Sequence, residues 1–263
     1  MKRIALVIAG LVAAHTASAG IYIEMANHNL TTNSTELEQK MYVQNGSGRF
    51  VDRDGHVSLI KGDAMYIIDD SDKTYIAMDK ATMEKVAKQL NDAIAKAKEQ
   101  IAKLPPDQRA QAEQMMGGAM GGAMGGGEHK VDVTDTGKSD TVEGRKCKVW
   151  DVTRNGELDE QICVVPFTAL PGKEDLTAVF ANFAKIYEDM AKSVPMLAGA
   201  MSNEFTARVK AGGFPVRSRA YESGKLIDEE TLVKVWREEA VPASMFEIPA
   251  GYKQKQLPMG PPH

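Results

Sequence analysis

The sequence is poor in the residues from which most catalytic and metal sites are built. Of its 263 residues, 2 are cysteine and 5 are histidine. The histidines form no His-x-x-x-His or His-Glu-x-x-His pattern, and no Gly-x-Ser-x-Gly elbow or phosphate-binding glycine loop occurs. The carboxylates are scattered or gathered in turns. We therefore expect a protein that is not an enzyme and that uses no cofactor.

Long apolar runs are absent beyond the N-terminus, so we expect no membrane span. The first residues have a different pattern, in which two basic residues precede an apolar run at residues 4–14, and an Ala-x-Ala sequence ends at Ala19. These are the three parts of a secretory signal peptide. We predict that residues 1–19 are a signal peptide cut between Ala19 and Gly20, and that the protein is periplasmic.

Basic patches with interleaved aromatic residues are also absent, and aromatic residues make up 6% of the chain. The net charge of the chain is −4, and removal of the signal peptide, which contains two basic residues and no acid, makes it −6. A negative surface repels nucleic acid and anionic lipid surfaces. We expect no nucleic-acid partner.

The cysteine pair is typical of a structural disulfide in an exported protein. Cys147 and Cys163 flank an Asn155-Gly156 turn signal between two strand-like runs. A three-residue loop with Gly156 in the left-handed conformation would place the two cysteines directly opposite each other. We predict a Cys147–Cys163 disulfide. Two free thiols are the alternative that the residues leave open.

The hydrophobic pattern predicts strands first and then a helix. Residues 20–78 contain short strand-like runs separated by turn residues, which indicates an antiparallel meander. From Asp79, which suits a helix N-cap, apolar residues recur at spacings of three and four up to Leu104. A second amphipathic helix follows Gly172, and strand patterns fill residues 130–166 and 214–238. The predicted class is α+β, with a curved, mostly antiparallel sheet (a half-barrel) covered by amphipathic helices.

A single domain at residues 20–252 accounts for this order of elements, followed by a disordered tail at residues 253–263. Within the domain, residues 105–128 are predicted to be a flexible Met/Gly-rich insertion that begins with a weak helix at residues 107–116. The glycine-rich part of this insertion is expected to be a loop, because glycine loses the most backbone entropy when it is ordered.

The methionines of the insertion suggest one possible function. Met116, Met120 and Met124 repeat every four residues close to His129. Thioethers are soft ligands that suit Cu(I), so a Met-rich periplasmic copper-binding protein is one interpretation. The other interpretation is that the methionines are flexible apolar filler on a loop.

The sequence also resembles a known family in three segments. These are residues 144–150, residues 160–172 and residues 245–252, the last reading Met-Phe-Glu-Ile-Pro-Ala-Gly-Tyr. They are similar to exported bacterial proteins with domain of unknown function 4412, whose architecture is similar to the half-barrels of periplasmic lipoprotein carriers. The resemblance implies a non-catalytic binding or carrier protein for an apolar, lipid or lipoprotein-like ligand. An envelope interaction or scaffold protein without a ligand cavity is the other alternative.

Overall fold

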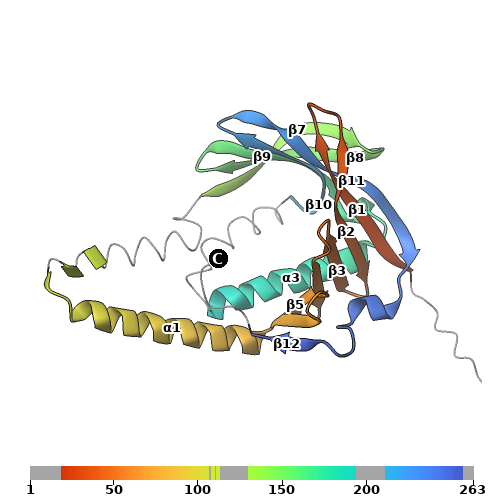
Figure 1. Ribbon diagram of the computed structural model, residues 1–263. Coiled ribbons are helices and arrows are strands. Elements are labelled where there is room, and N and C mark those ends of the chain that lie inside the picture. The colour runs from red at the N-terminus through yellow and green to blue at the C-terminus, as the bar shows by residue number, and fades with distance from the viewer. Residues whose placement is uncertain (1–18, 107, 110, 113–129, 194–210, 257–263) are drawn as a thin grey trace, which may run out of the picture.

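The structure, a computed structural model, describes residues 19–106, 108–109, 111–112, 130–193 and 211–256. In this part of the chain, twelve strands form one sheet, accompanied by two long helices and two short 3-10 helices (Figure 1). In chain order the elements are β1 (Ala19–Asn29), β2 (Thr35–Gln44), β3 (Ser47–Asp52), β4 (Val57–Lys61), β5 (Ala64–Asp69), β6 (Thr74–Met78), α1 (Lys80–Ala102), β7 (Val131–Val142), β8 (Arg145–Arg154), β9 (Glu157–Pro166), η1 (Phe167–Ala169), α3 (Lys173–Ser193), β10 (Gly213–Glu222), β11 (Lys225–Ala240), η2 (Ala243–Phe246) and β12 (Lys253–Lys255).

The sheet consists of two antiparallel meanders joined side by side. Strands β1 to β6 are neighbours in chain order, and so are β7 to β11. The pairing of β1 with β11 joins the meanders, and β12 adds to β6 as a parallel strand. The order of strands therefore leaves β7 and β12 at the two edges, and the described strands form an open, bent sheet (Figure 1). The expectation of a curved, mostly antiparallel sheet is confirmed.

The helices cover less of this sheet than the sequence predicts. Helix α3 lies inside the bend and packs against β2, β3, β4 and β5 (Figure 1). Helix α1 has its main contacts with α3 and β6 and extends away from the sheet. The expectation that both helices cover the sheet was therefore wrong for α1, because an apolar stripe predicts that a helix packs and not which surface it packs against. No described helix is both long and apolar enough to cross a membrane.

The first meander is buried on both faces. Side chains alternate along a strand, and the neighbours Leu59 and Ile60 of β4 are both buried but belong to different apolar clusters. The cluster of Ile60 includes Leu176 and Val179 of α3. The cluster of Leu59 includes Phe246 of η2, so the segment after β11 covers the face opposite α3.

Several local predictions can be compared with the structure. Asp79 is the N-cap of α1, and its side chain accepts a hydrogen bond from the Thr82 backbone N–H at 2.8 Å. The predicted disordered tail needs a correction, because Lys253–Lys255 forms β12 beside β6. In the insertion, residues 108, 109, 111 and 112 are helical, as the weak helix pattern predicts. The glycine-rich part and the predicted signal peptide, except Ala19, lie outside the described residues.

Candidate functional site

A hollow of about 350 Å³ lies where β8, β9 and β11 approach the link that leads into α3. We call it the Trp236 hollow. Most of its lining is apolar, and its two cationic residues come from the start of β8. The lining residues are Gly144, Arg145, Lys146, Val165, Ala169, Leu170, Pro171 and Trp236.

Local sequence explains how these segments come together. The turn between β7 and β8 is formed by Glu143 and Gly144, both with positive φ, so β8 begins at once with Arg145. On the other side, Gly172 holds the link to α3 against the sheet. Its φ is +66°, and a Cβ atom there would lie 2.1 Å from Cγ1 of Ile21. Glycine is therefore needed for the close approach of this link to the sheet.

The wall at Trp236 is anchored by a row of aromatic side chains. The Trp236 ring centroid lies 5.0 Å from that of Phe214, edge to face, and Phe214 lies 6.0 Å from Phe180 of α3. Phe180 in turn lies 5.5 Å from Phe167 of η1. Such pairs hold rings in defined orientations. The Trp236 indole Nε1 is buried and has no hydrogen-bond partner within the described structure.

The cationic side of the hollow is not neutralised by acids of the described structure. Arg145 donates from Nη1 to two backbone carbonyl oxygens, of Val233 at 3.3 Å and of Glu143 at 3.4 Å. The nearby Glu143 carboxylate accepts instead from Lys234 at 2.6 Å. Lys146 is exposed, and neither it nor Arg145 has a carboxylate partner among the described residues. The lining of the hollow therefore includes a guanidinium, that of Arg145, with no carboxylate partner in the described part of the chain.

A second hollow, of about 590 Å³, lies beside β7 and β8. We call it the Lys148 hollow. Alternation along β8 places Arg145 on one face of the sheet, and Lys146 and Lys148 on the other. Lys146 lines both hollows, which meet at the start of this strand. The residues of the second hollow are Ser139, Asp140, Thr141, Lys146, Cys147, Lys148 and Pro166.

A cluster of charged residues, which includes Asp140 of the Lys148 hollow, joins three strands. Arg217 of β10 donates to Asp140 of β7 at 2.8 Å, and its Nε lies 4.0 Å from Glu230 of β11. Glu230 accepts from Arg219 at 2.5 Å. The pKa of Asp140 is lowered mainly by a hydrogen bond from the Thr141 backbone N–H and, second, by the hydrogen bond from the Arg217 side chain. Each carboxylate has a guanidinium partner, so the cluster is suited to holding strands rather than to transferring protons.

The predicted disulfide is confirmed, with a Cα–Cα distance of 5.4 Å between Cys147 and Cys163. The predicted register was wrong. The turn has two residues, Asn155 and Gly156, both with positive φ, and an irregularity after Val152 shifts the pairing. As a result Val149, not Cys147, is opposite Cys163. The bridge therefore joins residues that are diagonal neighbours across the two strands. Counting residues outward from the turn did not predict this arrangement.

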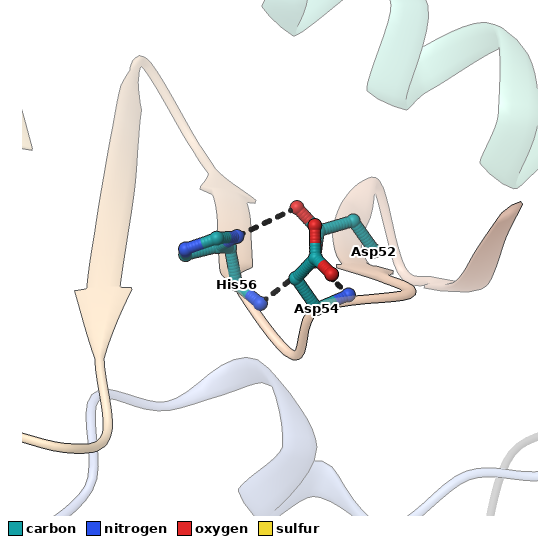
Figure 2. Close-up of side chains that lie close together, drawn as sticks. All are labelled: Asp52, Asp54 and His56. Atoms are coloured by element: carbon teal, nitrogen blue, oxygen red, sulfur yellow. Dashed lines mark hydrogen bonds and ion pairs between the residues drawn. The ribbon is translucent and has the colours of Figure 1, made fainter.

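A cluster of potential metal ligands lies in the turn between β3 and β4, as Figure 2 shows. Asp52 Oδ1 accepts from the backbone N–H of Asp54 at 2.9 Å and of His56 at 2.8 Å, and Oδ2 bonds His56 Nδ1 at 2.9 Å. Burial alone would raise the pKa of Asp52, but the bonds from His56 outweigh it and the pKa is lowered. Because Asp52 already uses both oxygens to hold an exposed turn, we interpret this cluster as structural.

Some of the residues that the sequence analysis singled out belong to these sites, and others do not. The copper candidates Met116, Met120, Met124 and His129 lie outside the described residues. The segments at residues 144–150 and 160–172, which carry the family resemblance, supply most of the Trp236 hollow. Sequence reasoning missed Trp236 itself, because one tryptophan in a strand pattern gives no sign of which distant segments it faces.

Comparison with known proteins places the chain in a family. Residues 78–252 match the Domain of unknown function (DUF4412), so the chain belongs to this family. All residues of the Trp236 hollow lie within the match. No curated protein matches the chain.

Fourteen chains in solved structures match in a structural search. One is from the complex of Pseudomonas aeruginosa MucA/MucB, with 13% identity and a TM-score of 0.34; the alignment covers 89% of this chain and 56% of that one. Another is from a structure of MucB in complex with MucA(peri), with 11% identity and a TM-score of 0.31; the alignment covers 89% of this chain and 54% of that one. The chain thus spans little more than half the length of these proteins.

Proposed function

We propose that this protein is a non-catalytic, periplasmic binding or carrier protein whose ligand has an apolar part that lies in the Trp236 hollow. The observation that carries the proposal is the convergence of apolar residues from β9, β11 and the link into α3 on one hollow. Its volume of about 350 Å³ is at the lower end of the usual range for small-molecule sites, roughly 300–1,000 Å³.

The bend of the proposed half-barrel is not one large open cavity, because a helix occupies part of it. Leu176, Val179 and Ile186 of α3 are buried in the main apolar cluster, so α3 fills the bend next to the first meander. A lipid or lipoprotein-like ligand would therefore place an acyl segment at the second meander, beside Trp236. The pairing of Asp140 and Glu230 with arginines supports a binding role without catalysis.

Mass spectrometry of protein purified from periplasm tests this function. Under gentle, native conditions we expect co-purifying acyl species that are extracted by organic solvent. Trp236→Ala should reduce their occupancy, because it removes the largest apolar wall of the hollow. Leu226→Ala is a matched control, since Leu226 is an exposed apolar residue, 39% accessible, at the other end of β11. A bare polypeptide mass for the unmodified protein would contradict the proposal.

One observation favours a second candidate, an envelope interaction or scaffold protein without a ligand cavity. The main apolar cluster joins α3, β1, β2, β8, β9 and β10 in one packed group. Such packing would suit a rigid body that presents surfaces to other proteins. Crosslinking in intact cells that captures a defined protein partner, together with a ligand-free native mass, would favour this candidate over the carrier.

A further inference from the structure

We infer that the ligand is an anionic amphiphile, a single apolar chain with a carboxylate or phosphate group, and that Arg145 binds its charged end. This inference rests on the proposed function and specifies the ligand of the same site. The juxtaposition that carries it is a guanidinium without an acidic partner among the described residues, in the lining of a mostly apolar hollow.

Arg145 is positioned to act as an anion-binding group. Two backbone carbonyls, of Val233 and Glu143, accept from its Nη1 and hold the side chain in place. A guanidinium has five N–H donors arranged as a fork that matches the oxygens of a carboxylate or phosphate. Because the carbonyls use only one nitrogen, donors at Nε and Nη2 remain for a ligand. The structure therefore holds the arginine without neutralising it.

The surrounding charges make this guanidinium unusual. Most cations near this end of the sheet have an acid beside them: Lys234 has Glu143 at 2.6 Å, and Lys148 has Asp135 at 3.9 Å. Arg145 and Lys146 have no such partner in the described part of a chain that carries a net charge of −4. A local positive charge on an acidic protein attracts an anion, and a neutral ligand would leave it uncompensated.

The apolar wall gives the other half of the ligand. Leu170, Pro171, Val165 and Trp236 offer no charged group, so a purely polar anion such as free phosphate would gain nothing from them. An attached hydrocarbon chain removes both its own surface and theirs from water. The two halves of the lining together therefore select a molecule with two chemically different ends.

Tryptophan fluorescence can test the inference, because the chain has 2 tryptophans and only one lines the hollow. In a Trp150→Phe background, Trp236 is the sole reporter. Decanoate, decanol and inorganic phosphate are titrated separately at low ionic strength, below any micelle formation. We expect a blue shift with decanoate, at least tenfold weaker binding of decanol, and no shift with phosphate alone.

Charge-removing variants connect the effect to the proposed residue. Arg145→Gln should weaken decanoate binding by about tenfold and leave decanol binding unchanged. Lys225→Gln is the matched control, because Lys225 is exposed at the far end of β11 from Trp236. If Arg145→Gln does not fold, the comparison of decanoate with decanol on the Trp150→Phe protein still tests the charged end of the ligand.

The outcomes separate the inference from the proposed function. Equal binding of decanol and decanoate would overturn the anionic ligand and leave an apolar binding site. Binding of phosphate as tight as that of decanoate would overturn the amphiphile, because the apolar chain would contribute nothing. If neither decanoate nor decanol changes the Trp236 emission, the hollow does not bind apolar chains, and both proposals are wrong.

Discussion

The two meanders of the sheet are stabilised in different ways. In the first, β1 to β6, apolar clusters cover both faces, and α3 and η2 provide the outer layers. In the second, β7 to β11, apolar clusters also lie on both faces, and a disulfide and a network of ion pairs join the strands in addition; both hollows lie at its end. Apolar packing gains from excluding every space, whereas a covalent bridge or ion pair fixes a distance between strands and leaves the surrounding space open.

This difference explains why the candidate site lies in the second meander. A binding hollow needs walls that stay apart when it is empty. The Cys147–Cys163 bridge joins β8 to β9 and the Asp140–Arg217 pair joins β7 to β10, so these strands keep their spacing beside the hollows. The predictions below test this difference between a half stabilised by packing and a half that is packed and also cross-linked, beginning with the largest expected effect.

Replacing Leu176 with alanine should have the largest effect. Leu176 is 0% exposed, in the layer that α3 adds to the sheet, and the change leaves a cavity there. We expect a loss of about 3–5 kcal/mol in the free energy of unfolding, measured by urea denaturation. Lys185→Ala, on the exposed side of the same helix, should stay within about 0.5 kcal/mol. Equal losses of unfolding free energy for the two variants would mean that packing of α3 does not stabilise the first meander.

Removing the disulfide should weaken the second meander. Replacement of both Cys147 and Cys163 by serine opens a loop with a sequence separation of 16 residues, so we expect a loss of roughly 2–4 kcal/mol. The unmodified protein in reducing agent should fall to the same stability, while the double variant should not respond to the reductant. An unchanged melting temperature in both cases would show that the bridge contributes nothing to this half.

The approach of the α3 link to the sheet can be tested with two glycines. Gly172→Ala and Gly156→Ala both place alanine at a positive φ, of 66° and 87°. Only at Gly172 would the new Cβ meet a buried side chain, Ile21, at 2.1 Å, whereas Gly156 has nothing within 4 Å. Gly172→Ala should therefore cost about 1–3 kcal/mol more in thermal unfolding. Equal melting temperatures would show that this contact can relax.

The smallest expected effect is the loss of stability at acidic pH that comes from protonation of Asp140. Because the pKa of Asp140 is lowered in the folded protein, its contribution is complete above the ordinary aspartate pKa of about 3.9 and is lost as pH falls through the lower, folded value. Its side chain is 45% exposed, so we expect less than about 1 kcal/mol. Urea unfolding at several acidic pH values should show a shallower loss for Asp140→Asn than for the unmodified protein. Asp92→Asn, exposed on α1, should behave like the unmodified protein; identical curves for all three would contradict the assignment.

Local pattern was sufficient to predict most elements. The N-cap at Asp79, the meander before it and the amphipathic pattern of α3 follow from side-chain chemistry within a few residues, and the structure agrees. The cysteine pairing was also predictable, because two cysteines flanking a turn signal have few options. Its register was not, since the turn signal gives no indication of the irregularity after Val152 that shifts the pairing.

The sequence by itself determined the two meanders, the two long helices, the disulfide and the family to which the chain belongs. Only the tertiary structure decided that α3 fills the bend while α1 leaves the sheet, and that Arg145 meets Leu170 and Trp236. The physical reason is the distance along the chain over which each kind of interaction acts. Strand and helix patterns record each residue's preference for water or core over a few positions, whereas a site depends on which surfaces, far apart in the chain, exclude water together.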